Sequence, residues 1–263
     1  MTTPTAFDTS LSATDFQDSG CRAFFKSFLS NDTFTECYPM SFFLQNSQSY
    51  IKMVRSDGLQ GVESLLSKSC GVDFDRCEQV MDSFLGNLKT QCKSDLKAQN
   101  SVVQAAQADF LAYPIVYKAT CAKANVDHAT ASTVGEYCYS EALFSNSSSA
   151  SYDSFLYLLP LGVSFPNTST TSNTSNPASS SMGLSCSSCN KKLLQLYHNH
   201  TDHDGFIRDT YASAASVLDS SCGADFVPPS VLPLNDEQSG SVRLDSPLTL
   251  VMALLFVTCL VTM

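Results

Sequence analysis

The chain has 263 residues, of which 43% are hydrophobic, and its formal net charge is -10. Such an acidic chain argues against nucleic acid as a partner and against electrostatic docking on anionic lipid. Seventeen phenylalanines together with this apolar fraction are enough to build a sizeable core. The length suits one large domain or two small ones.

Residues 1–20 are polar and rich in Thr, Ser and Asp, so we expect an irregular lead-in. The helical period dominates from the first cysteine onward. Residues 23–29 place phenylalanine and leucine at i, i+3, i+4 spacing, which predicts a helix. Residues 42–44 form a second apolar segment, and residues 59–66 predict a short helix that Gly71 can close.

The middle of the chain contains the clearest helical patterns. Residues 75–92 place cysteine, methionine and leucine on one face, and residues 102–113 repeat an apolar face at the same period. We expect Pro114 to interrupt the second helix, with residues 115–121 continuing beyond the break. Period-2 alternation is not sustained anywhere, so the sequence predicts an all-α fold stapled by disulfides.

The last third alternates between apolar and low-complexity sequence. Residues 152–165 are strongly apolar, whereas residues 164–185 are mostly Ser and Thr and form a predicted inserted loop that cannot support a core. The cysteine-rich helical domain is therefore expected to cover residues 21–227. A final helical pair follows the loop, with apolar faces formed by Leu193, Leu194 and Tyr197 and by Ile207, Tyr211, Ala214 and Leu218.

The C-terminal region predicts a lipid anchor. Residues 228–247 form a Pro/Ser-containing stalk and spacer, and residues 248–263 are sixteen residues without a charge. A spanning helix needs roughly 20 apolar residues, whereas small residues, a spacer and a terminal apolar tail are typical of glycosylphosphatidylinositol (GPI) attachment. We expect attachment at Ser239, which Gly240 and Ser241 follow. The mature chain would then lie wholly outside the cell, on the extracellular face of the plasma membrane.

Eleven cysteines divide into one inside the predicted tail, Cys259, and an even ten before it. An even set predicts up to five disulfides and an oxidising compartment. The ten cysteines expected to pair are Cys21, Cys37, Cys70, Cys77, Cys92, Cys121, Cys138, Cys186, Cys189 and Cys222.

Spacing does not determine the pairing, because ten cysteines allow roughly 945 connectivities. We expect Cys121 to pair with Cys138, closing one loop, and either Cys186 or Cys189 to pair with Cys222. The Cys186-x-x-Cys189 motif could instead be a redox pair or half of a zinc site. The sequence contains no second C-x-x-C and no βαβ pattern, so structural disulfides are the preferred interpretation.

Five Asn-x-Ser/Thr sequons agree with passage through the secretory pathway. The first twenty residues lack a basic start and a continuous apolar run, so they are not a signal peptide. GPI attachment requires entry into the endoplasmic reticulum, so we expect the signal peptide to be missing from this sequence. The alternative is that the apolar tail is a tail-anchor that holds a cytosolic domain. The sequons are Asn31, Asn146, Asn167, Asn173 and Asn199.

Three of the four histidines gather in residues 197–205 beside two carboxylates, and imidazole with carboxylate suits zinc or copper. A hydrophilic loop is the preferred interpretation, because a glycan on Asn199 would crowd a metal. A calcium loop fails, since Tyr211 would occupy the twelfth position, where an acid is needed. No metal or cofactor is therefore expected, and the weak candidate ligands are His198, His200 and His203.

A set of residues spread roughly from Phe7 to Val227 carries a family resemblance. The set comprises Ala6 to Thr9, Cys21 to Phe25, Phe34 to Cys37, Pro39, Ser41, Cys77, Cys92, Tyr113, Tyr137 to Tyr139, Tyr152 to Gly162, Cys186, Cys189 and Ser221 to Gly223. With these residues in view, the chain resembles a fungal family of cysteine-rich, GPI-anchored surface proteins built on a domain of unknown function. The resemblance implies a location at the cell surface or in the cell wall and no particular activity, and proteins of that family normally begin with a signal peptide.

No G-x-S-x-G elbow or glycine-rich phosphate loop is present, so we do not expect an enzyme. The first hypothesis is a surface protein with a structural, adhesive or recognition role, held in the membrane by its lipid and facing wall polysaccharide or other surface proteins. The alternative is an extracellular module that binds a small apolar or metal-containing ligand. A deep apolar pocket would favour the ligand module, and clustered desolvated carboxylates or histidines would favour catalysis.

Overall fold

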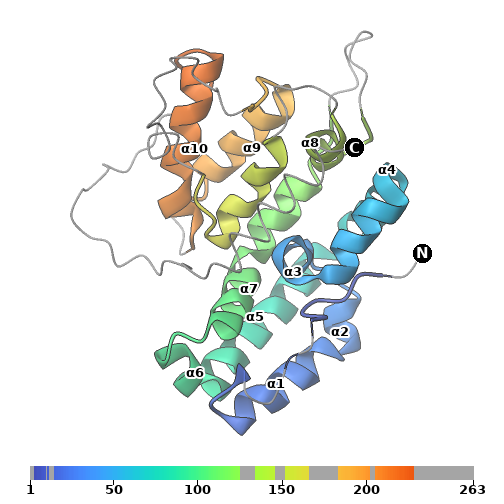
Figure 1. Cartoon of the computed structure of the whole chain (residues 1–263), viewed down its shortest axis with the longest axis vertical. Coiled ribbons are helices and arrows are strands. Elements are labelled where there is room, and N and C mark those ends of the chain that lie inside the picture. Colours follow the sequence, from blue (N-terminus) through green and yellow to red (C-terminus); the bar gives the residue numbers. More distant parts are fainter. Residues whose placement is uncertain are drawn as a thin grey trace, which may run out of the picture. The chain divides into compact units, whose positions relative to one another are not determined.

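The computed structural model describes residues 3–9, 11, 15–124, 134–145, 152–165, 183–201 and 205–227. These residues form ten α-helices and one 3₁₀-helix and no β-strand, which confirms the predicted all-α fold (Figure 1). The chain divides into two compact units, one ending at Cys121 and the other beginning at Ala122, called unit 1 and unit 2 below. The predicted stalk and tail, and most of the predicted Ser/Thr-rich loop, lie outside the described residues.

Unit 1 is built on α7, a long helix that packs against α3 and α5, while α1 packs against α5. Figure 1 shows α5 running beside α7. Burial of one apolar face per helix provides most of the driving force for this arrangement. The helices of unit 1 are α1 (Ser19–Leu29), α2 (Asp32–Thr35), α3 (Met40–Asn46), α4 (Gln48–Cys70), α5 (Phe74–Gln91), α6 (Lys93–Lys97) and α7 (Ser101–Thr120).

Side-chain caps fix where most of the longer helices of unit 1 begin. Asp18 accepts a hydrogen bond from the backbone N–H of Gly20 at 2.8 Å, and Asn100 accepts from that of Val102 at 3.0 Å. Each such cap satisfies a backbone donor that the helix leaves unpaired, a contribution of about 1 kcal/mol. The other caps in unit 1 are Asn31 on α2, Ser47 on α4 and Asp73 on α5.

Two helices differ from the sequence prediction. α4 begins at Gln48 instead of near residue 59, and its two parts join across a kink at Gly58, whose φ of 54° favours glycine. Pro114 does not interrupt α7, which continues to Thr120. Proline removes one helical hydrogen bond, but the packing of α7 against α3 and α5 supports the helix through this position.

Phenylalanine rings fill the core of unit 1 around Phe28, which is completely buried. Its ring centroid lies 5.1 Å from that of Phe34 and 5.3 Å from that of Phe110. Edge-to-face arrangements dominate, as expected for rings with opposite charge on face and edge. The cluster joins α1, α2, α3, α5 and α7 through Phe24, Phe25, Phe28, Phe34, Phe42, Phe84 and Phe110.

The N-terminal segment is packed into this core, although it is not helical. Phe7 is buried with its ring 5.6 Å from that of Phe25, and its backbone N–H donates to the carbonyl of Asn46. The Asp8 carboxylate accepts the backbone N–H of Gln48 at 2.7 Å at the start of α4. The early Ala-Phe-Asp motif therefore has a structural role: it closes one side of unit 1.

Unit 2 packs α10 against both η3 and α9, and α8 against η3. Large tyrosines fill its core, whereas phenylalanines fill that of unit 1. Tyr139, Tyr157, Tyr197 and Tyr211 are all nearly completely buried. The helices of unit 2 are α8 (Cys138–Phe144), the 3₁₀-helix η3 (Asp153–Leu161), α9 (Ser188–His198) and α10 (Ile207–Cys222).

All ten cysteines before the predicted tail are paired, with three disulfides within unit 1 and two within unit 2. The predicted Cys121–Cys138 pair is wrong. Cys121, at the end of α7, pairs with Cys70 at the end of α4, because the two helix ends bring their Cα atoms within 5.5 Å. The Cys186–Cys222 pair agrees with the prediction. The five disulfides are Cys21–Cys92, Cys37–Cys77, Cys70–Cys121, Cys138–Cys189 and Cys186–Cys222.

Candidate functional site

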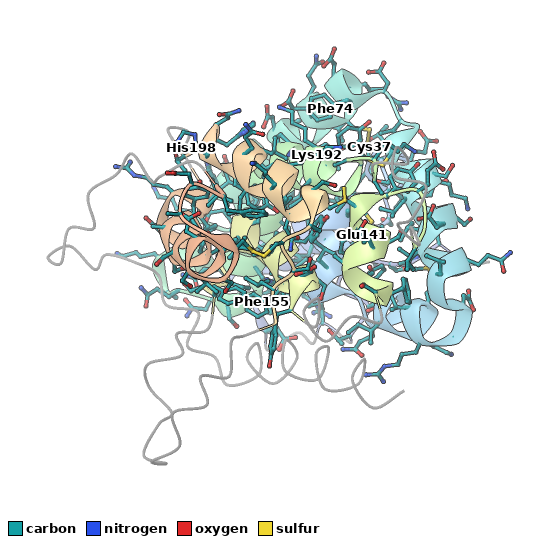
Figure 2. All side chains as sticks on the ribbon, turned by 90° about the horizontal axis from the view of Figure 1, so that it is seen from above. Cys37, Phe74, Glu141, Phe155, Lys192 and His198 are labelled. Carbon is teal, nitrogen blue, oxygen red and sulfur yellow. A yellow bond between two sulfur atoms is a disulfide. The ribbon has the colours of Figure 1, made fainter. Side chains whose placement is uncertain are left out.

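The most chemically distinctive group of side chains in unit 2 is a pair of carboxyl groups, Glu141 on α8 and Asp153 at the start of η3. Glu141 is labelled in Figure 2. Asp153 is 3% exposed. It accepts the backbone N–H of Ser185 at 2.8 Å and the hydroxyl of Ser185 at 2.5 Å. Asn190 donates to the Ser185 carbonyl at 2.8 Å, so these polar groups hold the segment before α9 against η3.

The environment of both carboxyl groups favours their neutral forms. Burial raises the pKa of Asp153, although hydrogen bonds from Ser185 and Asn190 oppose this effect. Burial and the nearby charge of Asp153 raise the pKa of Glu141. Desolvation and a like charge are the two ordinary causes of a raised carboxyl pKa.

Buried tyrosines adjoin this pair. The rings of Tyr139 and Tyr157 meet edge to face at 4.7 Å. Burial raises the pKa of Tyr157 and of Tyr197 well above the ordinary value, so both stay protonated. The Tyr197 hydroxyl has no hydrogen-bond partner among the described residues, and an unpaired buried hydroxyl costs about 1–3 kcal/mol.

This arrangement is chemically suited to anchoring rather than to nucleophilic attack. Two of the acceptor contacts of Asp153 go to the backbone and side chain of Ser185, which fixes the chain there. The Oε2 atom of Glu141 lies 3.6 Å from the Sγ atom of Cys189. That sulfur belongs to the Cys138–Cys189 disulfide. The carboxyl pair is therefore tied to the disulfide framework of unit 2.

The histidine segment is partly described. The ring of His198 meets that of Tyr211 at 5.8 Å, and Nδ1 of His200 lies 2.8 Å from the carbonyl oxygen of Leu196. His203 lies outside the described residues. Within the described part of the chain, no group of three His, Cys, Asp or Glu side chains could hold a metal ion, and the loop interpretation stays a prediction.

Two of the predicted sequons can be placed. Asn199 is exposed at the C-terminal end of α9, whereas Asn31 is half-buried and caps α2 through Oδ1, 2.9 Å from the backbone nitrogen of Thr33. Because a glycan attaches to Nδ2, the Asn31 cap is compatible with glycosylation. Glycosylation at either site remains a prediction. The other predicted modification sites, Asn146, Asn167, Asn173 and Ser239, lie outside the described residues.

Unit 1 contains an apolar hollow beneath its N-terminal segment. Its volume is about 40 Å³. Pockets for small molecules have volumes of roughly 300–1,000 Å³, so this hollow is water-sized and cannot admit a drug-sized or haem-sized ligand. It is lined by Pro4, Thr5, Ala6, Leu29, Phe34, Thr35, Pro39 and Phe43.

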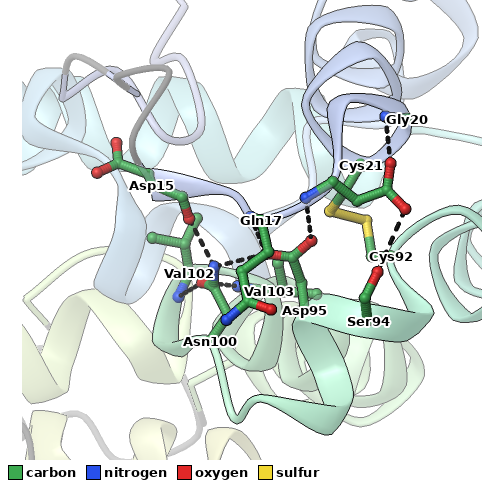
Figure 3. Close-up of a disulfide and its surroundings, with 11 residues drawn as sticks. Asp15, Gln17, Gly20, Cys21, Cys92, Ser94, Asp95, Asn100, Val102 and Val103 are labelled. Atoms are coloured by element: carbon green, nitrogen blue, oxygen red, sulfur yellow. Dashed lines mark hydrogen bonds between the residues drawn. A yellow bond between two sulfur atoms is a disulfide. The ribbon is translucent and has the colours of Figure 1, made fainter.

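Asp95 is the centre of a hydrogen-bond network beside the Cys21–Cys92 disulfide (Figure 3). It is fully buried and accepts the backbone N–H groups of Gln17 at 2.8 Å and Asp18 at 3.2 Å. It also accepts the side-chain amide of Asn100 at 2.9 Å. Asp95 thereby joins the approach to α1, α6 and the start of α7.

Asp109 is a second buried carboxyl in unit 1, 1% exposed on α7. Asn46 donates to its Oδ2 at 2.7 Å. Burial raises the pKa of Asp109 well above its ordinary value, and the Asn46 hydrogen bond only partly offsets this effect. The sequence marked neither Asp95 nor Asp109, because their burial depends on helix packing that a single sequence does not reveal.

We expect Asp109 to make unit 1 more stable in mild acid than at neutral pH. Its pKa is higher in the folded chain than in the unfolded chain, so its stabilising effect is complete below the unfolded pKa. That effect is lost as the pH rises toward the folded pKa, with a slope of up to about 1.4 kcal/mol per pH unit for one proton. Denaturant unfolding between pH 4 and pH 7 measures it.

The matched variants are Asp109→Asn, which removes the titrating group, and Asp82→Asn, which removes the same charge from an exposed position on α5. Asp109→Asn should flatten the pH profile and stabilise unit 1 at neutral pH, whereas Asp82→Asn should keep the wild-type slope. Parallel profiles for wild type and Asp109→Asn would contradict the assignment.

Comparison with known families gives one match. The family profile described as a domain of unknown function (DUF7729) matches residues 2–231. Comparisons with curated proteins and with solved structures each return no match. Among the described residues, no helix is long and apolar enough to cross a membrane.

Proposed function

The chain belongs to the DUF7729 family, and from its paired cysteines and its C-terminal sequence we propose that it is a non-enzymatic, GPI-anchored surface protein of a fungal cell. Its two helical units would stand outside the plasma membrane or in the wall, on a glycosylated stalk. These units would have a structural, adhesive or recognition role. Candidate partners are wall polysaccharide and other surface proteins.

The observation that carries this proposal is the complete pairing of the ten cysteines before the tail. Multiple structural disulfides indicate an oxidising environment, because cytosolic thiols are kept reduced. Each disulfide closes a loop of between 36 and 71 residues. By the chain-entropy account, loops of this length stabilise the folded state by about 4 kcal/mol each, before native-state strain is counted.

The cores support a scaffold better than a ligand module. The hollow of unit 1 is about 40 Å³, and rings of phenylalanine or tyrosine occupy the centres of the two units. A module for haem or lipid needs a pocket several times larger. In unit 2 the buried carboxyl group of Asp153 accepts hydrogen bonds from Ser185 of the same chain, so these bonds serve the fold. These features favour contacts between the outer surface of the helical units and a partner over binding of a ligand inside the core.

The presence of a GPI anchor is tested by phospholipase release of the native protein from the cells that produce it. Treatment with a GPI-specific phospholipase should release a glycosylated chain that ends near Ser239. A chain truncated before residue 248 should instead appear directly in the medium, which is the matched control for secretion without an anchor. A chain that stays in the membrane fraction after phospholipase, without glycans, would contradict the proposal and favour a tail-anchored protein.

A further inference from the structure

Two disulfides of unit 2 meet at the start of α9. Cys186 bonds to Cys222 at the end of α10, and Cys189 bonds to Cys138 at the start of α8. Only two serines separate Cys186 from Cys189. The C-x-x-C motif is therefore not one disulfide; its sulfurs belong to two different ones.

The two disulfides differ sharply in their access to solvent. Cys186 is exposed and Cys222 is half-buried, whereas Cys138 and Cys189 are 1% and 4% exposed. Each of the other three disulfides is formed by two buried or two half-buried cysteines. Because thiol–disulfide exchange requires access to a sulfur, a small thiol should reach the Cys186–Cys222 bond first.

The two motif cysteines lie at the start of α9. Ser187 caps α9 by accepting the backbone N–H of Asn190 at 3.1 Å, so Cys189 lies in the first turn and Cys186 directly precedes the cap. The C-x-x-C spacing allows two cysteines to form a disulfide with each other, as in thioredoxin-type motifs. The positive end of the helix dipole also favours a thiolate on Cys186 once its own disulfide opens.

We propose that these four cysteines form a thiol-exchange relay that accepts small thiols. A thiolate attacks Sγ of Cys222, forms a mixed disulfide there and breaks the bond to Cys186. The released Cys186 thiolate attacks Sγ of Cys189 and forms a Cys186–Cys189 disulfide. The Cys138–Cys189 bond breaks, and Cys138 leaves as a thiolate that takes a proton from water. Two disulfides exist before and after, and the proton of the incoming thiol is balanced by the one that Cys138 gains.

One polar contact of the buried disulfide favours this direction. The carbonyl oxygen of Lys123 lies 3.4 Å from Cys138 Sγ. A disulfide sulfur has no proton to donate, whereas the released Cys138 thiol could donate its S–H to that carbonyl.

The relay acts at the end of α10. Cys222 is the last residue of that helix, and after its disulfide opens the segment still has a hydrogen bond from the Val227 N–H to Asp219 at 3.0 Å. The exchange therefore removes the covalent link between the end of α10 and the segment before α9, while the Val227 hydrogen bond remains.

The Cys222→Ser variant of the full chain tests the relay without any reductant, because it leaves Cys186 as a thiol. Under alkylation of the folded protein, the label should divide between Cys186 and Cys138, and part of the chain should contain a Cys186–Cys189 disulfide. Cleavage after Leu184 and Leu193 isolates both motif cysteines in one peptide for mass mapping. Label on Cys186 alone, with Cys138–Cys189 intact, would overturn the proposal.

The paired control is the Cys186→Ser/Cys222→Ser variant, in which Cys138 should stay unlabelled because no attacking thiol remains. A second measurement uses wild-type chain and so does not depend on the folding of a variant. One equivalent of glutathione should produce a mixed disulfide on Cys222 and label on Cys138. First labelling at any other disulfide, or equal label on Cys186 and Cys222 with none on Cys138, would also overturn the relay.

Discussion

Replacing Phe28 with alanine is expected to lower the free energy of unfolding of unit 1 by about 3–5 kcal/mol, the range for removing a fully buried aromatic side chain. Phe28 is 0% exposed, and its ring meets those of Phe34 and Phe110 at 5.1 and 5.3 Å. The deletion leaves a cavity that five helices border. Denaturant unfolding followed by circular dichroism measures the change.

Phe74 provides the matched control, because it is half-buried and lies beside Tyr117 instead of inside the Phe28 cluster. Its replacement by alanine should cost about 1 kcal/mol, in proportion to the smaller apolar area removed from water. Equal losses for Phe28→Ala and Phe74→Ala would contradict a core centred on Phe28.

The second large effect is expected at Asp95. Asp95→Ala should cost about 2–4 kcal/mol, because it removes the acceptor of three part-buried hydrogen bonds, each of which contributes about 0.5–1.5 kcal/mol. The donors are two backbone N–H groups, on Gln17 and Asp18, and the Asn100 amide. Hydrogen exchange should report the loss first at the approach to α1 and at the start of α7.

Asp95→Asn should recover part of the loss, since the amide keeps one acceptor oxygen while its NH₂ group meets other donors. Asp82→Ala on the exposed face of α5 should stay within about 0.5 kcal/mol of wild type. If Asp95→Ala were as mild as Asp82→Ala, the network in Figure 3 would not support the fold as described.

Amphipathic periodicity predicted the longer helices well, because their buried faces recur at i, i+3 and i+4. The missed first part of α4 contains the same signal, since Tyr50, Met53 and Val54 are buried at that spacing and Ser47 caps the helix. The effect of Pro114 was predicted wrongly because helix propensity is local, whereas the packing that supports α7 is tertiary. Phe7 was missed for a similar reason: its partners lie on α1 and α3.

Cysteine pairing marks the limit of sequence-based inference. The end of α10 could be matched to the start of α9 because the two helices were expected to form a pair. Cys70 and Cys121 meet only because α4 and α7 end at the same place, a fact that depends on the packing of unit 1. A single sequence contains no signal for that adjacency.

The chemistry of the candidate site was also hidden. Glu141 and Asp153 approach each other because α8 and η3 pack together, and the anchor of Asp153, Ser185, lies 32 residues further along the chain. The sequence directed attention to the histidine segment instead, where His198 and His200 contact protein groups.

The most direct test of the outward-facing account is a thiol count on the native chain after phospholipase release. We predict no free thiol in the denatured, unreduced protein and ten after reduction, since five disulfides use every cysteine before the tail and Cys259 leaves with the tail. Intact mass with and without reductant should differ by the corresponding ten hydrogens. One free thiol would show that the tail is retained, and a largely reduced chain would contradict the extracellular location itself.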